Sequence, residues 1–176
     1  MFIVISGPIG IGKSTLLKNL AKRLAETNQI GGIITLGQET KRFVDLKTQK
    51  TSYFKEEKDK KGIQIGKYFI ADRALKFAAK TLETASDYDI VFIDEIGRLE
   101  VKKRGLYKSI FKLLKSINKE GKIVIFGVRQ EVVHQLSRLF SIHPNKTWFL
   151  TKQPSEDFLI KVTEFIIKAL MREGGL

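Results

Sequence analysis

Short, nearly uninterrupted apolar runs alternate along this chain with longer segments in which apolar residues recur every three or four positions. The apolar runs predict buried strands at Phe2–Ser6, Ile30–Thr35, Ile90–Ile93, Ile123–Gly127 and Thr147–Leu150. Strands that are apolar along their whole length are typical of a parallel sheet that is covered on both faces. The pattern therefore indicates strands from the interior of a layered α/β protein.

The segments between these strands have the period of amphipathic helices. In residues 13–26, for example, Leu16, Leu17, Leu20 and Leu24 form one apolar stripe. The same spacing predicts helices over 73–84, 105–119 and 155–172. Alternating strands and helices favour an α/β fold in which helices flank a mostly parallel sheet. The length of 176 residues suits a single domain over 1–176.

Residues 36–70 depart from this alternation. They predict short strands at Arg42–Leu46, Thr51–Lys55 and Ile63–Ile70, separated by polar and glycine-containing turns. We expect a small β-rich insertion or an antiparallel extension beside the main sheet, too short to be a domain of its own. At the other end of the chain, the tail 172–176 is expected to fray.

Composition narrows the possible classes of protein. The chain has no cysteine, which excludes disulfides, thiolate metal sites and cysteine nucleophiles. No segment approaches the roughly 18 to 20 apolar residues that span a bilayer. We therefore expect a cytoplasmic protein that does not contact membranes. The pattern also shows no obligatory interface, so a monomer is expected.

The formal net charge of +13 raises the question of a polyanionic partner. The basic residues are dispersed, however. Those of 55–61 alternate with Glu56, Glu57 and Asp59, and the basic run 102–104 is short. Aromatic residues in an RNA-binding pattern are also missing. Nucleic acid is therefore a possible partner but not the expected one.

The first predicted strand leads into a glycine-rich loop, Gly7-x-x-x-x-Gly12-Lys13-Ser14, that matches the phosphate-binding P-loop pattern. Glycines let successive backbone N–H groups point inward around phosphate oxygens, and the following helix presents its positive end to the anion. Lys13 can reach the β- and γ-phosphates, and the Ser14 hydroxyl can bind Mg²⁺. The predicted nucleotide contacts are Gly7, Pro8, Ile9, Gly10, Ile11, Gly12, Lys13, Ser14 and Thr15.

Two acidic residues end the predicted strand Ile90–Ile93. Asp94 is suited to hold Mg²⁺ together with Ser14, as the strand-end acid of P-loop NTPases does. Glu95 can accept a proton from a water that attacks the γ-phosphate, which simple kinases do not need. Lys13 and Glu95 are thus candidate catalytic residues.

The Asp-Glu pair resembles the division of P-loop proteins that hydrolyse ATP with an additional catalytic glutamate. The resemblance implies that another strand, here Ile123–Gly127, lies between the P-loop strand and the strand that ends in Asp94. Arg129 would then emerge near the γ-phosphate, where an arginine can stabilise charge in the transition state. Arg129 is therefore the third candidate catalytic residue.

The segment Asp94-Glu95-Ile96-Gly97-Arg98-Leu99-Glu100 is more specific. Together with the P-loop, the 31–35 strand and the 65–68 segment, it resembles the nucleoside-triphosphatase family of thermophiles, which has a human cancer-related homologue. The resemblance implies a RecA-like α/β core. It also implies slow, Mg²⁺-dependent hydrolysis of nucleoside triphosphates (ATP, GTP, CTP, UTP) to diphosphate and phosphate, with loose base selectivity.

The chain departs from this family after the second strand. Many members continue with Thr-Glu-Glu-hydrophobic-Arg, whereas Leu36-Gly37-Gln38-Glu39 follows Thr35 here. Arg42 is a candidate to replace the missing arginine. Within the acidic segment, Arg98 is a candidate for contact with phosphate or for an ion pair with Glu100, and we expect Glu100 to orient Arg98 rather than to act chemically.

Two alternatives to hydrolysis remain at this level. One is a small P-loop kinase that transfers the γ-phosphoryl group to a nucleotide or small alcohol, since such kinases have similar lengths. A strand order with the Asp94 strand directly beside the P-loop strand would favour it. The other is a nucleotide-dependent binding module for RNA, which the positive charge suggests.

Overall fold

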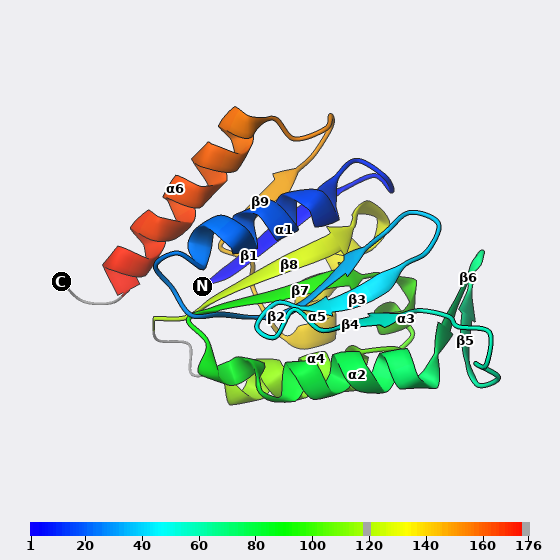
Figure 1. Cartoon of the computed structure of the whole chain (residues 1–176). Coiled ribbons are helices and arrows are strands. Elements are labelled where there is room, and N and C mark those ends of the chain that lie inside the picture. Colours follow the sequence, from blue (N-terminus) through cyan, green and yellow to red (C-terminus); the bar gives the residue numbers. More distant parts are fainter. Residues whose placement is uncertain (118–120, 174–176) are drawn as a thin grey trace.

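The computed structural model describes residues 1–117 and 121–173, and within them it contains a seven-stranded sheet (Figure 1). The strand order is β4-β3-β2-β7-β8-β1-β9. The parallel strands are β1 (Phe2–Gly7), β2 (Ile30–Leu36), β7 (Ile90–Ile96), β8 (Ile123–Arg129) and β9 (Lys146–Phe149). The predicted mostly parallel sheet is thus confirmed.

The position of β8 answers the question of strand order. β8 pairs in parallel with β1 on one side and with β7 on the other. The P-loop strand and the strand that carries Asp94 are therefore not neighbours, as the resemblance to glutamate-bearing ATP-hydrolysing proteins implied. A kinase would have been favoured by the Asp94 strand directly beside the P-loop strand, which is not the order observed.

Helices cover both faces of the sheet (Figure 1). On one face, α1 (Lys13–Leu24) and α6 (Glu156–Glu173) pack on Ile3 and Ile5 of β1. On the other, α2 (Asp72–Glu83), α4 (Tyr107–Ser116) and α5 (Leu136–Phe140) share a cluster with Phe2 and Val4. Successive β1 residues thus enter opposite cores, which explains the continuous apolar run.

The insertion has two parts. β3 (Arg42–Asp45) and β4 (Thr51–Tyr53) extend the main sheet antiparallel, whereas β5 (Gly62–Ile65) and β6 (Tyr68–Ala71) form a separate hairpin. The prediction of one strand over Ile63–Ile70 is therefore wrong. Gly66 has a φ of 55° and reverses the chain between paired Ile65 and Tyr68, which apolar periodicity does not reveal.

Several short elements were not predicted, because one or two helical turns show no periodicity. They are the 3₁₀ helices η1 (Ala85–Asp87) and η2 (Gln130–Gln135), the helix α3 (Arg98–Val101) and α5. The helix predicted over 105–119 begins only at Tyr107, since Gly105 has a left-handed backbone with a φ of 60°. Positions 118–119 of that prediction, and 174–176 of the tail expected to fray, lie outside the described residues.

Over the described ranges, none of the helices combines the length and the apolar character needed to cross a bilayer.

Candidate active site

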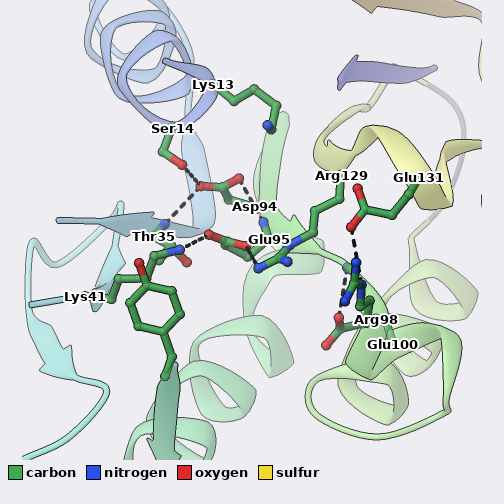
Figure 2. A network of polar contacts seen from close by, with 12 residues as sticks. Lys13, Ser14, Thr35, Lys41, Asp94, Glu95, Arg98, Glu100, Arg129 and Glu131 are labelled. Atoms are coloured by element: carbon green, nitrogen blue, oxygen red, sulfur yellow. Dashed lines mark hydrogen bonds and ion pairs between the residues drawn. The ribbon is translucent and has the colours of Figure 1, made fainter. Parts of the chain in front are cut away.

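The sequence-predicted site residues meet at the carboxyl edge of the sheet. β1 runs into the P-loop there, β7 carries Asp94 and Glu95 just before its last residue, Ile96, and β8 ends at Arg129. Figure 2 shows the side chains of Lys13, Ser14, Asp94, Glu95 and Arg129 gathered in one network. The parallel arrangement causes this, because it brings the carboxyl ends of neighbouring strands to one edge.

The P-loop has the backbone that its glycines predict. Gly7, Gly10 and Gly12 have φ values of 153°, 81° and 99°, and Gly12 immediately precedes α1. The Lys13 ammonium donates to the carbonyl oxygens of Gly7 at 2.7 Å and Pro8 at 2.8 Å. It therefore lies inside the curve of the loop, where burial lowers its pKa.

Asp94 is buried near the end of β7 and accepts three hydrogen bonds. Its Oδ2 accepts hydrogen bonds from Ser14 Oγ at 2.7 Å and from the Thr35 N–H at 3.1 Å, and its Oδ1 accepts from the Glu95 N–H at 2.8 Å. Burial raises the pKa of Asp94 to about 6, and the charge of Glu95 adds to this. The structure thus brings Ser14 and Asp94 into direct contact.

A glycine on β8 makes room for this carboxylate. A Cβ atom added to Gly127 would lie 2.1 Å from Asp94 Oδ1 and 2.8 Å from Leu17 Cδ1. The strand between the two halves of the site must therefore lack a side chain at this position.

Glu95 has an unusual backbone and two cationic partners. Its φ of 62° is rare for a residue with a side chain, and it falls where the pairing of β7 with β8 is irregular, between Ile93 and Ile96. Lys41 Nζ lies 2.5 Å from Glu95 Oε1, and Arg129 Nη2 lies 3.4 Å from Oε2. Burial raises the pKa of Glu95, but Lys41 and then Arg129 outweigh burial and hold the pKa below its usual value.

Lys41 is the site residue that sequence reasoning missed. It precedes β3, and its ammonium lies 4.8 Å from the centre of the Tyr68 ring. Arg42, the candidate replacement for the family's arginine, instead starts β3 with its guanidinium 5.8 Å from the Tyr53 ring. The basic residue of this segment that reaches the site is thus Lys41, the neighbour of Arg42. A lysine in a polar loop carries no sequence signal, and only the pairing of β2 with β7 brings the loop to Glu95.

The expectation that Glu100 orients Arg98 is wrong. Arg98 Nε lies 3.5 Å from Glu131 Oε1, and its side chain is largely exposed. Glu100 is buried and accepts from the N–H groups of Gly97 at 3.0 Å and Leu106 at 3.1 Å. Residues two apart on a helix point in different directions, so α3 separates the two side chains. Burial raises the pKa of Glu100 to about 7.

This fold and site define a P-loop NTPase: a phosphate loop and a buried Asp-Glu strand end meet at one edge of a RecA-like parallel sheet. The particular family follows from the sequence. The sequence model of the NTPase family matches residues 2–162, and the chain belongs to that family.

Individual relatives support this assignment. The chain is 30% identical to the nucleoside-triphosphatase THEP1 of Methanosarcina barkeri over 149 residues, which cover 80% of this chain and 85% of the relative. It is 26% identical to the protein of the same name from Hyperthermus butylicus, over 99% of this chain and 96% of the relative. The crystal structure of THEP1 from the hyperthermophile Aquifex aeolicus has the same fold, with a TM-score of 0.70 at 21% identity, and covers 97% of this chain and 99% of that one.

Proposed function

We propose that this protein hydrolyses nucleoside 5′-triphosphates to nucleoside diphosphate and phosphate, with Mg²⁺ and with loose selectivity for the base. The observation that carries the proposal is the position of Glu95, a carboxylate directly after the buried Asp94 and beside the P-loop. The curated relatives named nucleoside-triphosphatase support it.

The residues at the carboxyl edge suit a magnesium ion. Ser14 Oγ and Asp94 Oδ2 are two adjacent oxygen donors, and the nearby Thr35 hydroxyl is buried without a hydrogen-bond partner in the described parts of the chain. Those parts hold no cluster of three or more His, Cys, Asp or Glu side chains suited to a metal. P-loop proteins do not need one, because phosphate oxygens and water complete the coordination. When bound, the cation would neutralise phosphate charge and polarise the γ-phosphoryl group.

The protein's own groups then have separate tasks. Lys13 exchanges the carbonyls of Gly7 and Pro8 for β- and γ-phosphate oxygens. Glu95 orients a water and accepts its proton while the water oxygen bonds to the γ-phosphorus. The bond from this phosphorus to the β–γ bridging oxygen breaks, and the diphosphate leaves. Arg129 stabilises the charge that develops on the transferred group.

Glu95 also borders a small cavity on the side of the insertion. This cavity of about 40 Å³ is lined by Glu95, Lys41, Gly97 and Arg129 and by apolar side chains from the insertion and α3. The strand order, with β8 between β7 and β1, supports hydrolysis over phosphoryl transfer.

The loop after β9 supports tolerance of different bases. It lies beside the P-loop, because a Cβ atom added to Gly12 would be 3.2 Å from Pro154 Cδ. Its sequence, Thr151-Lys152-Gln153-Pro154, contains no carboxylate that could pair with the hydrogen-bond donors of guanine. A loop in this place without such an acid offers no basis for selecting guanine.

The test is a phosphate-release panel over the common nucleoside triphosphates, with and without Mg²⁺ and with and without candidate acceptors. Glu95→Gln should lower kcat by about 100-fold or more, because it removes the general base, while nucleotide affinity changes little. Glu57→Gln, an exposed carboxylate in the insertion, is the matched control and should keep parental activity. Phosphate release by Glu95→Gln at the parental rate would show that the base is wrongly assigned.

A further inference from the structure

We propose that Lys41 is a positioning residue that holds the Glu95 carboxylate in place during turnover, which leaves Arg129 free to contact the γ-phosphate. This inference rests on the proposed function of Glu95. It assigns a role in the site to the β2–β3 loop, which carries Lys41, and to the β5–β6 hairpin, which carries Tyr68.

The two cations do not hold Glu95 equally. Lys41 Nζ is 2.5 Å from one carboxylate oxygen, whereas Arg129 Nη2 is 3.4 Å from the other. The Lys41 side chain is only 14% exposed and that of Glu95 24%, so water screens their attraction less than it screens a surface pair. Lys41 therefore makes the shorter of the two contacts with Glu95.

The ends of the strands place the two cations on opposite sides of Glu95. Arg129 pairs in register with Gly7, the first residue of the phosphate loop. Lys41 comes from the β2 side of β7 (Figure 2). A triphosphate on the loop would thus meet the guanidinium of Arg129 first, and Lys41 would remain with the carboxylate.

The Lys41 side chain is in turn held by Tyr68 of the β5–β6 hairpin. Its ammonium lies 4.8 Å from the centre of the Tyr68 ring, within the range of a cation–π contact. The Tyr68 hydroxyl donates to the Gln38 carbonyl at 2.9 Å and so joins the hairpin to the β2–β3 loop. Lys67 lies 5.3 Å from the same ring centre, but its exposed side chain makes no described contact with Glu95.

The experiment compares steady-state phosphate release, nucleotide affinity and thermal melting across matched variants. Lys41→Met should lower kcat by about 10- to 100-fold, the scale expected when a catalytic group is misplaced, with KM within about twofold of the parent. Lys41→Arg should recover most of the loss, because a cation returns to Glu95. Lys67→Met removes the same charge from the same ring and should keep parental kcat.

Two further variants distinguish a positioning role of Lys41 from a loss of activity caused by misfolding. Tyr68→Leu leaves Lys41 and Glu95 in place but removes the ring, and should give a smaller loss of kcat in the same direction. In the double variant Lys41→Met with Glu95→Gln, the second change should add nothing, because Lys41 acts through Glu95.

The results distinguish this inference from the proposed function. Parental kcat in Lys41→Met beside an inactive Glu95→Gln would overturn the role of Lys41 alone. Equal losses in Lys67→Met and Lys41→Met, or a further loss in the double variant, would do the same. Parental kcat in Glu95→Gln would overturn the proposed function and, with it, this role.

Discussion

At the scale of single residues, two carboxylates of one short segment lie in opposite electrostatic surroundings. Glu95 faces two cations, which hold its pKa below the usual value. Glu100 accepts hydrogen bonds from two backbone N–H groups, and burial raises its pKa to about 7 despite them. The sequence predicted Glu95 as the general base and Glu100 as the partner of Arg98, but only Glu95 lies between charged side chains.

Glu100 should make the stability of the fold depend on pH. Its folded pKa of about 7 is above the unfolded value near 4.5, so the folded state binds the proton more tightly. This contribution is full below about pH 4.5 and is lost as the pH rises through about 7, on the order of 3 kcal/mol. The free energy of unfolding, from urea titrations at pH 5 and pH 8, should fall accordingly.

Glu100→Gln provides the comparison for this prediction. The variant cannot titrate, so its unfolding free energy should fall less between pH 5 and pH 8 than that of the parent. It should also be less stable at pH 5, because the amide can accept only one of the two hydrogen bonds from Gly97 and Leu106. An unchanged pH dependence would show that another group is responsible.

At the scale of elements, the sheet strands and the long helices could be predicted from their apolar residues. Burial of both faces of a strand leaves a continuous apolar run, and burial of one face of a helix leaves a periodic pattern. The strand pairing irregularity at Asp94 and Glu95 could not be predicted, since the residues read as a simple strand end. Nor could the β5–β6 hairpin, whose turn depends on the backbone of Gly66. Such features depend on single backbone angles, which periodicity does not contain.

Gly127→Ala tests the fit between β8 and β7. The added methyl group would lie 2.1 Å from Asp94 Oδ1, so either the carboxylate or the strand must move. We expect a loss of about 1–3 kcal/mol in unfolding free energy, typical of overpacking. We also expect weaker binding of Mg²⁺, so that half-maximal phosphate release needs a higher Mg²⁺ concentration. Urea unfolding and a Mg²⁺ titration measure the two effects. Parental values in both would show that the space at this position is not needed.

At the scale of the whole molecule, the site joins segments that are distant in sequence. The P-loop and the strand end at Asp94 could be predicted from motifs, because each motif carries its own chemistry. The arginine at 129 could be predicted only from the strand order that the resemblance implied. Lys41 and the buried hydroxyl of Thr35 could not, because their relevance depends on the sheet order β2-β7-β8-β1. From a single sequence, the reactive residues of a site can be predicted more readily than the loops that surround them.

A nucleotide bound at this junction should stabilise the entire fold. A non-hydrolysable triphosphate with Mg²⁺ at about 100 times its Kd should add roughly 3 kcal/mol and raise Tm by several degrees. Glu95→Gln should show the same increase, since it retains the loop and Asp94. Lys13→Met should show little, because it lacks the phosphate-binding ammonium. Equal increases in both variants at matched ligand concentration would contradict the assigned role of Lys13.

The left-handed backbone at Glu95 places strain at the residue that the proposed reaction needs. Glycine adopts a φ of 62° without cost, and asparagine adopts it more readily than glutamate. Glu95→Gly would relieve this backbone strain, but it would also leave Lys41 and Arg129 without their carboxylate partner. A library selected for turnover would retain the glutamate and its strain. Thermostable variants of this enzyme should accordingly be sought away from the end of β7.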